Sequence, residues 1–160
     1  MKIIIKKFLL IFIPSALLVF LDQYTKIYAN TNFKTNKLII IDGVLELTYH
    51  ENRGAAFGIM QNQYILFYIL TIIIMIFLIY FINKLELNNR NLPLFICAIL
   101  IISGAIGNFI NRFFDKYVID FIYFKLIDFP VFNLADTYIT IACFLFIFLS
   151  IFVYKDKEIL

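Results

Sequence analysis

The sequence predicts an all-α membrane protein, in which four transmembrane helices carry a small β-sheet outside the membrane. Hydrophobic residues make up 63% of the 160 residues and charged residues only 16%, whereas soluble proteins are roughly half apolar and a quarter charged. The mean hydropathy is +0.93. A single domain of this length has too little polar surface to cover so many Ile, Leu and Phe side chains. A soluble globular domain is therefore excluded.

Four apolar segments supply the predicted helices, at about residues 8–28, 64–82, 93–111 and 137–154. A helix needs about 20 residues to cross the hydrocarbon core of a bilayer. Backbone groups in lipid must be satisfied within the protein, which allows only helices or a closed barrel. The alternation of period two that a barrel requires is absent from these segments. We therefore predict four helices in one domain covering residues 1–160.

The first apolar segment has the basic start of a cleavable signal peptide, because Lys6 and Lys7 precede it. No small-x-small cleavage site follows, and the segment continues through Asp22 and Lys26. We expect this segment to be retained as the first transmembrane helix.

Basic residues predict the orientation of the helices. Seven of the 14 Lys and Arg residues lie in the short segments 1–7, 83–92 and 155–160, and the other seven are spread over longer connections. An even number of spans places both termini on one side of the membrane. Because short cytoplasmic segments are enriched in Lys and Arg, we predict that both termini are cytoplasmic.

The two outer connections, residues 30–63 and 112–136, are predicted to form the sheet. Residues 37–49 contain an apolar strand, a turn at Asp42-Gly43 and an alternating strand, a pattern typical of a β-hairpin. Residues 112–136 are also apolar and rich in β-forming residues, with Pro130 as a break. We expect a small sheet on the outer face of the membrane.

The remaining composition argues against nucleic-acid binding and metal chemistry. The net charge is +3, and no run of Lys and Arg exceeds two residues, so no nucleic-acid partner is expected. Cys97 and Cys143 lie in apolar segments, and His50 has no Cys or His at ligand spacing. We expect no metal and no cofactor, which leaves carboxylates, hydroxyls, amides and lysines for chemistry.

Ionisable residues at membrane depth are functional candidates by default. Asp22, Thr25, Lys26 and Ala29 share one face of the first helix. The alternative is that Asp22 and Lys26 only neutralise each other where the helix leaves the membrane.

The third helix carries a second polar face. Gly104, Gly107, Asn108, Asn111 and Arg112 follow helical spacing, and the glycines allow close approach of another backbone. The alternative is a packing face of small residues that ends in a snorkelling arginine.

Two carboxylates stand out near the outer connections. Asp136 lies at the predicted N-terminus of the last helix, where Asp is a common cap. Asp120 lies in the apolar run 117–124, where packing provides no reason for a carboxylate. The break at residues 128–130 lets the chain turn back and bring the two acids together.

Two adjacent carboxylates share one proton, because ionising both is costly. The charged member then activates water while the neutral member donates to a substrate carbonyl. The residues therefore predict a membrane hydrolase that uses Asp120 and Asp136 at the outer membrane surface. A transporter or channel component is the alternative, although a proton relay places its acids near the middle of the membrane.

Four motifs link these positions: Asp22-Gln-Tyr-Thr-Lys26, Asn52-Arg-Gly-Ala-Ala-Phe-Gly58, Gly104-Ala-Ile-Gly-Asn-Phe-Ile-Asn-Arg112 continuing to Val118-Ile-Asp-Phe121, and Phe132-Asn-Leu-Ala-Asp136. In order and spacing they resemble the motifs of bacterial lipoprotein signal peptidases (signal peptidase II), a family of four-helix membrane aspartyl peptidases. The resemblance implies removal of the signal peptide from a prolipoprotein, just before its diacylglyceryl-modified cysteine. It implies Asp120 and Asp136 as the catalytic pair.

The resemblance also implies a site, a location and partners. The positions that match those lining the family's substrate site are Asp22, Lys26, Asn52, Gly54, Gly104, Asn108, Arg112, Asn133 and Ala135. The predicted sheet is similar to the family's outer-face β cradle. We expect a multi-pass protein of the bacterial cytoplasmic membrane, with its site towards the outer face. Its expected partners are lipid-modified prolipoproteins and membrane lipid, and we expect a monomer.

Two positions depart from the family pattern. Asn111 stands where the family usually has Asp, which is expected to leave Arg112 without an ion-pair partner. Lys116 stands where the family usually has Gly, which places a charge in a turn near the site. The segment after Gly58, including residues 60–63, is the predicted flap.

Overall fold

Four helices form the body of the computed structural model, which describes residues 2–55 and 59–154. They are α1 (Lys2–Asn32), α2 (Tyr64–Lys84), α3 (Leu92–Phe114) and α4 (Leu134–Phe148), the last continued by the π-helical turn η3 (Leu149–Val153). All four are long and apolar enough to cross a membrane when η3 is counted with α4. The predicted four-helix architecture is confirmed.

The helix ends differ from the predicted ones at both ends of the chain. Helix α1 extends beyond residues 8–28 in both directions, from Lys2 to Asn32. Helix α4 begins at Leu134 rather than at residue 137. Asn133 is the N-cap of this helix, and Asp136 in its first turn completes a capping box with it.

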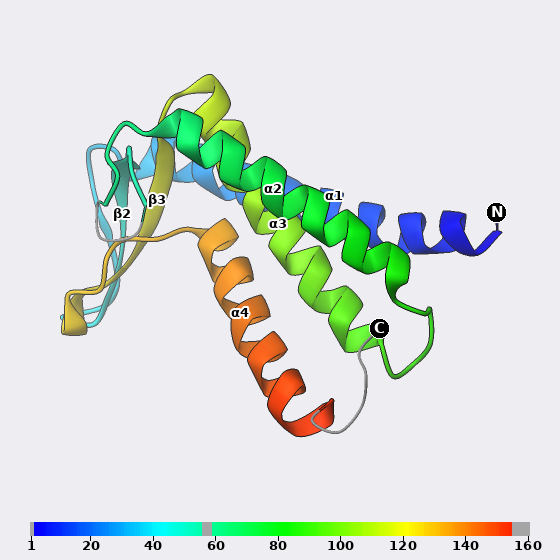
Figure 1. Cartoon of the computed structure of the whole chain (residues 1–160). Helices are drawn as coiled ribbons and strands as arrows, with labels where there is room; N and C mark the ends of the chain where they lie inside the picture. The colour runs from blue at the N-terminus through cyan, green and yellow to red at the C-terminus, as the bar shows by residue number, and fades with distance from the viewer. Residues whose placement is uncertain (1, 56–58, 155–160) are drawn as a thin grey trace.

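A three-stranded antiparallel sheet lies at the end of the helices where α1 and α3 end and α2 and α4 begin (Figure 1). Its strands are β1 (Leu38–Ile41), β2 (Leu45–Asn52) and β3 (Val118–Phe124), in the order β1-β2-β3. The predicted hairpin is present, and Gly43 adopts the positive φ of 70° that its turn requires. β3 pairs with the other edge of β2, which joins the two outer connections into one sheet.

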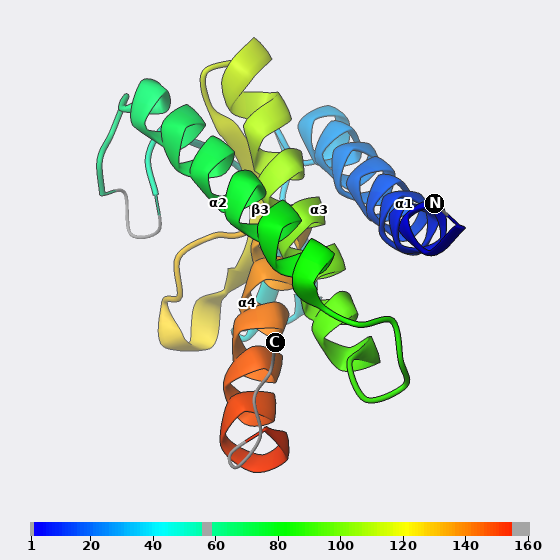
Figure 2. The same ribbon diagram turned by 45° about the vertical axis from the view of Figure 1, so that its right-hand side comes forward.

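Helix α3 is the central helix, and α1, α2 and α4 all pack against it (Figure 2). Its buried residues include Phe95 and Ile102, which join a core cluster with Leu78 of α2 and Leu149 of η3. The helices that surround α3 instead expose large apolar side chains, such as Phe77 of α2. Such exposure suits lipid rather than water.

Close packing of α3 on α4 depends on Gly104. A Cβ atom at this position would collide with the backbone carbonyl of Ala135 and with the Ile139 side chain. A backbone carbonyl at a helix start cannot move aside without shifting the helix. The absence of a side chain at Gly104 therefore sets the separation of α3 and α4.

We predict that Gly104→Ala lowers the free energy of unfolding by about 1–3 kcal/mol, the usual cost of overpacking. The measurement is thermal unfolding of the purified protein in detergent micelles. Cys143→Ala, on an exposed position of α4, is the control and should unfold at the wild-type temperature. If Gly104→Ala unfolds at the wild-type temperature, the absence of a side chain at Gly104 does not set the separation of α3 and α4.

Candidate active site

Asp120 lies in the middle of β3 and is buried. Its Oδ2 accepts a hydrogen bond from Asn52 Nδ2 at 2.9 Å, and its Oδ1 accepts one from Asn133 Nδ2 at 2.6 Å. In the antiparallel register Asp120 is the cross-strand partner of His50 on β2. Side-chain amides from both sides thus hold the carboxylate in one orientation.

Asp136 lies in the first turn of α4, held by the capping box and by α3. Its Oδ1 accepts from Asn108 Nδ2 at 2.8 Å, and its Oδ2 accepts from the backbone N–H of Asn133 at 3.2 Å. The Asp136 N–H in turn donates to Asn133 Oδ1 at 3.0 Å. The helix N-terminus and one amide therefore fix this second carboxylate.

Both carboxylates line one cavity of about 890 Å³. The cavity lies between β2, β3, the connection 127–132 and the start of α4, with Arg112 of α3 also in its wall. Its apolar side is formed by Phe124, Phe129, Pro130, Val131, Phe132, Ile139 and Ile141. The fold thus brings an acid from a strand and an acid from a helix to the same partly apolar space.

The ionisation of Asp120 reflects this environment. Burial, followed by repulsion from the Asp136 carboxylate, raises the pKa of Asp120 from its ordinary 3.8 to about 7. The hydrogen bonds from Asn52 and Asn133 act in the opposite direction, because amide donors favour the charged form. Asp120 therefore keeps its proton at pH values below about 7.

Asp22 and Lys26 form a buried ion pair behind these acids. Lys26 Nζ lies 2.8 Å from Asp22 Oδ2, and both side chains are almost wholly inaccessible. Asp22 Oδ1 also accepts the backbone N–H of Ala135 at 3.0 Å. A carboxylate at a helix N-terminus is stabilised by the partial positive charge there. The ion pair therefore joins α1 to the start of α4. This contact argues against the alternative that Asp22 and Lys26 only neutralise each other where α1 leaves the membrane.

Asn108 links this ion pair to the two acids. Its Oδ1 accepts from Lys26 Nζ at 2.9 Å and from Asn133 Nδ2 at 3.2 Å, while its Nδ2 donates to Asp136. Gly107 makes room for the contact between helices, because a Cβ there would lie 2.5 Å from Asp22 Oδ2. The network is thus continuous from α1 through α3 to the carboxylates.

A second branch of the network passes through Asn52. Its Oδ1 accepts from the backbone N–H of Gly54 at 2.9 Å, and the Gly54 carbonyl accepts from Arg112 Nη2 at 2.9 Å. The Arg112 guanidinium also lies over the Phe67 ring, 4.3 Å from its centroid. This branch ties the start of the motif at residues 52–58 to α3. Residues 56–58 of that motif lie outside the described residues.

The nine residues expected to bind substrate thus fall into two groups. Asn52 and Arg112 line the cavity itself. The others hold the carboxylates from behind or set the helix packing: Asp22, Lys26, Gly54, Gly104, Asn108, Asn133 and Ala135.

The two departures from the family pattern have local explanations. Arg112 is held by the Gly54 carbonyl and the Phe67 ring, so it is anchored without an acid at Asn111. Asn111 is buried and lies near Gln23 of α1. Lys116 adopts a φ of +65°, a conformation that favours glycine. Its ammonium lies over the Tyr68 ring and donates to the Phe113 carbonyl at 3.1 Å.

The sequence argument missed three residues of this region. Gln23 Nε2 donates to Asp22 Oδ2 at 2.9 Å and to the Gly107 carbonyl at 3.0 Å. His50, considered only as a metal ligand, lines the cavity next to Asp120, its cross-strand partner. Thr140 lines it one turn of α4 after Asp136. Helical spacing from Asp136 was the available signal for Thr140, whereas Gln23 carries no pattern of its own.

The described part of the chain contains no group of three or more His, Cys, Asp or Glu side chains placed to hold a metal ion. The donors that surround the two acids are amides, which suit an anionic or carbonyl oxygen.

We predict that Lys26→Met lowers the free energy of unfolding by about 3–5 kcal/mol, because it leaves the buried Asp22 carboxylate without its counter-charge. Thermal unfolding in micelles is the measurement. The double variant Asp22→Asn with Lys26→Met should recover part of this loss, since it removes both charges. A single variant as stable as the double variant would contradict a buried ion pair.

Comparison with known proteins places this arrangement in a family. Residues 15–152 match the family model described as signal peptidase (SPase) II. A lipoprotein signal peptidase of Streptococcus thermophilus is 44% identical over 138 residues, which cover 84% of this chain and 89% of that protein. One from Geobacillus thermodenitrificans is 39% identical over 150 residues, 92% of each chain.

The fold comparison agrees. A solved bacterial membrane enzyme superposes with a TM-score of 0.79 at 35% identity and covers 93% of each chain. A second such structure gives a TM-score of 0.76 at 36% identity. None of these relatives supports the transporter alternative. The chain, a multi-pass membrane protein, belongs to the signal peptidase II family of peptidases.

Proposed function

We propose that this protein is an aspartyl endopeptidase that removes signal peptides from diacylglyceryl-modified prolipoproteins, with Asp120 and Asp136 as the catalytic pair. The observation that carries the proposal is that these two acids face one cavity, each oriented by amide donors. Asp128 also lines the cavity, but it accepts from the Tyr123 hydroxyl on the exposed side.

The chemistry follows from one proton shared by the pair. The charged carboxylate takes a proton from a water molecule, whose oxygen attacks the carbonyl carbon of the scissile bond. The neutral carboxylic acid donates its proton to the carbonyl oxygen, which gives a neutral tetrahedral intermediate. When the C–N bond breaks, the departing nitrogen takes the proton of the protonated carboxyl. One hydroxyl of the intermediate gives its proton to the other carboxylate as the carbonyl reforms, so the pair again holds one proton.

The cavity suits a substrate that arrives from lipid. Its apolar side, from Phe129 to Ile141, can accept the diacylglyceryl group and the hydrophobic signal peptide. Arg112 and Asn52 at its polar side supply donors for backbone carbonyls next to the cut. We therefore assign lipid recognition to the apolar side of the cavity and orientation of the peptide to its polar side.

The orientation follows from the same assignment. Prolipoproteins are modified and cleaved where the signal peptide leaves the membrane, so we place the sheet and the carboxylates at the outer face of the bacterial cytoplasmic membrane. Both termini are then cytoplasmic, in agreement with the density of Lys and Arg near residues 1–7 and 83–92. We assign the active form as a monomer, since both acids come from one chain.

We predict that Asp120→Asn and Asp136→Asn each reduce cleavage by roughly 10²–10⁴-fold or more, the usual contribution of a general acid or base. The assay mixes purified protein with a prolipoprotein that carries its diacylglyceryl group, and with the same prolipoprotein lacking it. Only the lipidated form should be cut, and a chelator should leave the rate unchanged.

The matched control is Asp115→Asn, which changes an exposed acid at the end of α3 and should cleave at the wild-type rate. Full activity in either catalytic variant would refute the assignment of the pair. Inhibition by the chelator would refute the metal-free mechanism.

We predict that cleavage falls as the pH rises through about 7. The folded-state pKa of Asp120 is raised to about 7, so the shared proton is present below this pH and lost above it. The measurement is kcat/KM between about pH 5 and pH 9. Asn52→Ala should move the falling limb to higher pH, because the Asn52 amide stabilises the charged form of Asp120. If the falling limb stays at the same pH in Asn52→Ala, Asp120 is not the group whose titration controls cleavage.

A further inference from the structure

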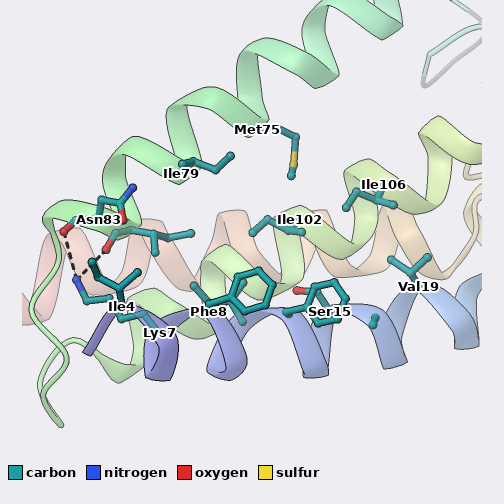
Figure 3. A pocket seen from close by; sticks show the side chains of 14 residues that line it. Ile4, Lys7, Phe8, Ser15, Val19, Met75, Ile79, Asn83, Ile102 and Ile106 are labelled. Atoms are coloured by element: carbon teal, nitrogen blue, oxygen red, sulfur yellow. Dashed lines mark hydrogen bonds between the residues drawn. The ribbon is translucent and has the colours of Figure 1, made fainter. Parts of the chain in front are cut away.

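A second cavity, of about 470 Å³, lies between α1 and α2 with α3 as its floor. Figure 3 shows Phe8, Ser15 and Val19 reaching into it from α1, Met75 and Ile79 from α2, and Ile102 and Ile106 from α3. It shares no lining residue with the cavity of the two acids. We call it the α1–α2 groove.

The groove contains an unpaired polar group. Ser15 is 5% exposed, and its hydroxyl has no hydrogen-bond partner among the described residues. The buried Ser103 hydroxyl, by contrast, donates to the Ile99 carbonyl of its own helix. Ser15 and Ala16 are also small, so they keep the groove open where larger side chains would fill it. This face of α1 is therefore not completed by the helices of the chain itself.

The groove is shorter than a membrane-spanning segment. Along α1 it runs from Ile4 to Val19, which at 1.5 Å per residue is about 22 Å. Half of a hydrocarbon core of about 30 Å is about 15 Å. A transmembrane helix would need contacts along the full core of about 30 Å, whereas the acyl chain of a lipid occupies one leaflet. The dimensions favour a lipid chain over a partner helix.

The polar end of the groove favours an anionic headgroup. Lys7 Nζ donates to the carbonyls of Ile82 at 3.3 Å and Asn83 at 3.2 Å, at the C-terminal end of α2 (Figure 3). An ammonium group has three N–H donors, so one N–H remains beyond these two described acceptors. The Asn83 side chain lines the same end. A positive charge and amide donors at the membrane surface complement a phosphodiester.

We propose that the α1–α2 groove binds one anionic phospholipid, with an acyl chain along Phe8, Ser15 and Val19 and its phosphate at Lys7. This lipid belongs to the leaflet at the C-terminal end of α2, opposite the sheet. The proposal is independent of the peptidase mechanism, because no residue of the active site takes part.

The test uses fluorescence, because the chain contains no tryptophan. A Phe12→Trp reporter lies in the groove, and a Phe144→Trp reporter lies on an exposed position of α4. Each protein is reconstituted in bilayers that contain increasing fractions of brominated phosphatidylglycerol or brominated phosphatidylcholine, whose acyl chains quench tryptophan on contact. The groove reporter should be half-quenched at an about fivefold lower fraction of the anionic lipid, the preference expected from one lysine.

Three further variants locate the lipid. Lys7→Gln should abolish the anionic preference of the groove reporter, and Lys7→Arg should keep it. Ser15→Phe should reduce quenching by both lipids, because it fills the groove. The Phe144→Trp reporter should respond equally to both lipids in every background.

The proposal is overturned if the groove reporter responds equally to the two lipids, or if Lys7→Gln retains the preference. It is also overturned if neither lipid quenches the groove reporter, which would indicate that protein fills the groove. Cleavage activity measured on the same samples verifies that each variant is folded.

Discussion

Asn133 joins the start of α4 to both candidate carboxylates, through its side chain to Asp120 and its backbone N–H to Asp136, and the geometry of the site depends on it. Its side-chain oxygen caps α4 by accepting from the Asp136 N–H, while its side-chain amide nitrogen donates to Asp120 and Asn108. All of these groups lie in an apolar environment, where an unpaired polar atom is costly. One buried amide therefore sets the direction of a helix and the orientation of two acids together.

This polar network requires unusually close helices, and small residues provide them. Gly104 lets α3 approach the first turn of α4, and Gly107 leaves room for the Asp22 carboxylate. Asp22 can then accept from the Ala135 N–H while it pairs with Lys26. A larger side chain at either glycine would separate charges from their partners. The glycines of α3 thus act through electrostatics as well as through packing.

The two ends of the molecule have different organisation. Near the sheet, buried amides and charges hold a cavity that contains two acids. Near the other end, Leu94, Phe95 and Leu149 form an apolar core that stabilises α3 against its neighbours. The α1–α2 groove lies beside this core and shares Ile82 and Ile102 with it. The apolar core near one membrane surface thus packs together the helices that carry the polar site near the opposite surface.

Much of the fold and part of the site could be predicted from the sequence. Apolar length determines the four helices, because lipid leaves the backbone no other partners. Local patterns also determined the hairpin around Gly43 and the shared face of Asp22 and Lys26, since both depend on residues close in sequence. A carboxylate in the apolar run around Asp120 was visible for the same reason.

Only the tertiary structure decided which polar atoms meet. Asn133 caps α4, because its extended backbone directly precedes Leu134, while Asp136 lies inside the first turn and is also held by Asn108 from another helix. Arg112 is anchored by a carbonyl 58 residues away. Gln23 lies within the first motif, but only the structure shows that it joins α1 to α3. Hydrogen bonds need a match of a few tenths of an ångström between distant segments. Hydrophobic periodicity places a helix in the membrane, but it leaves the rotation and depth of that helix to packing.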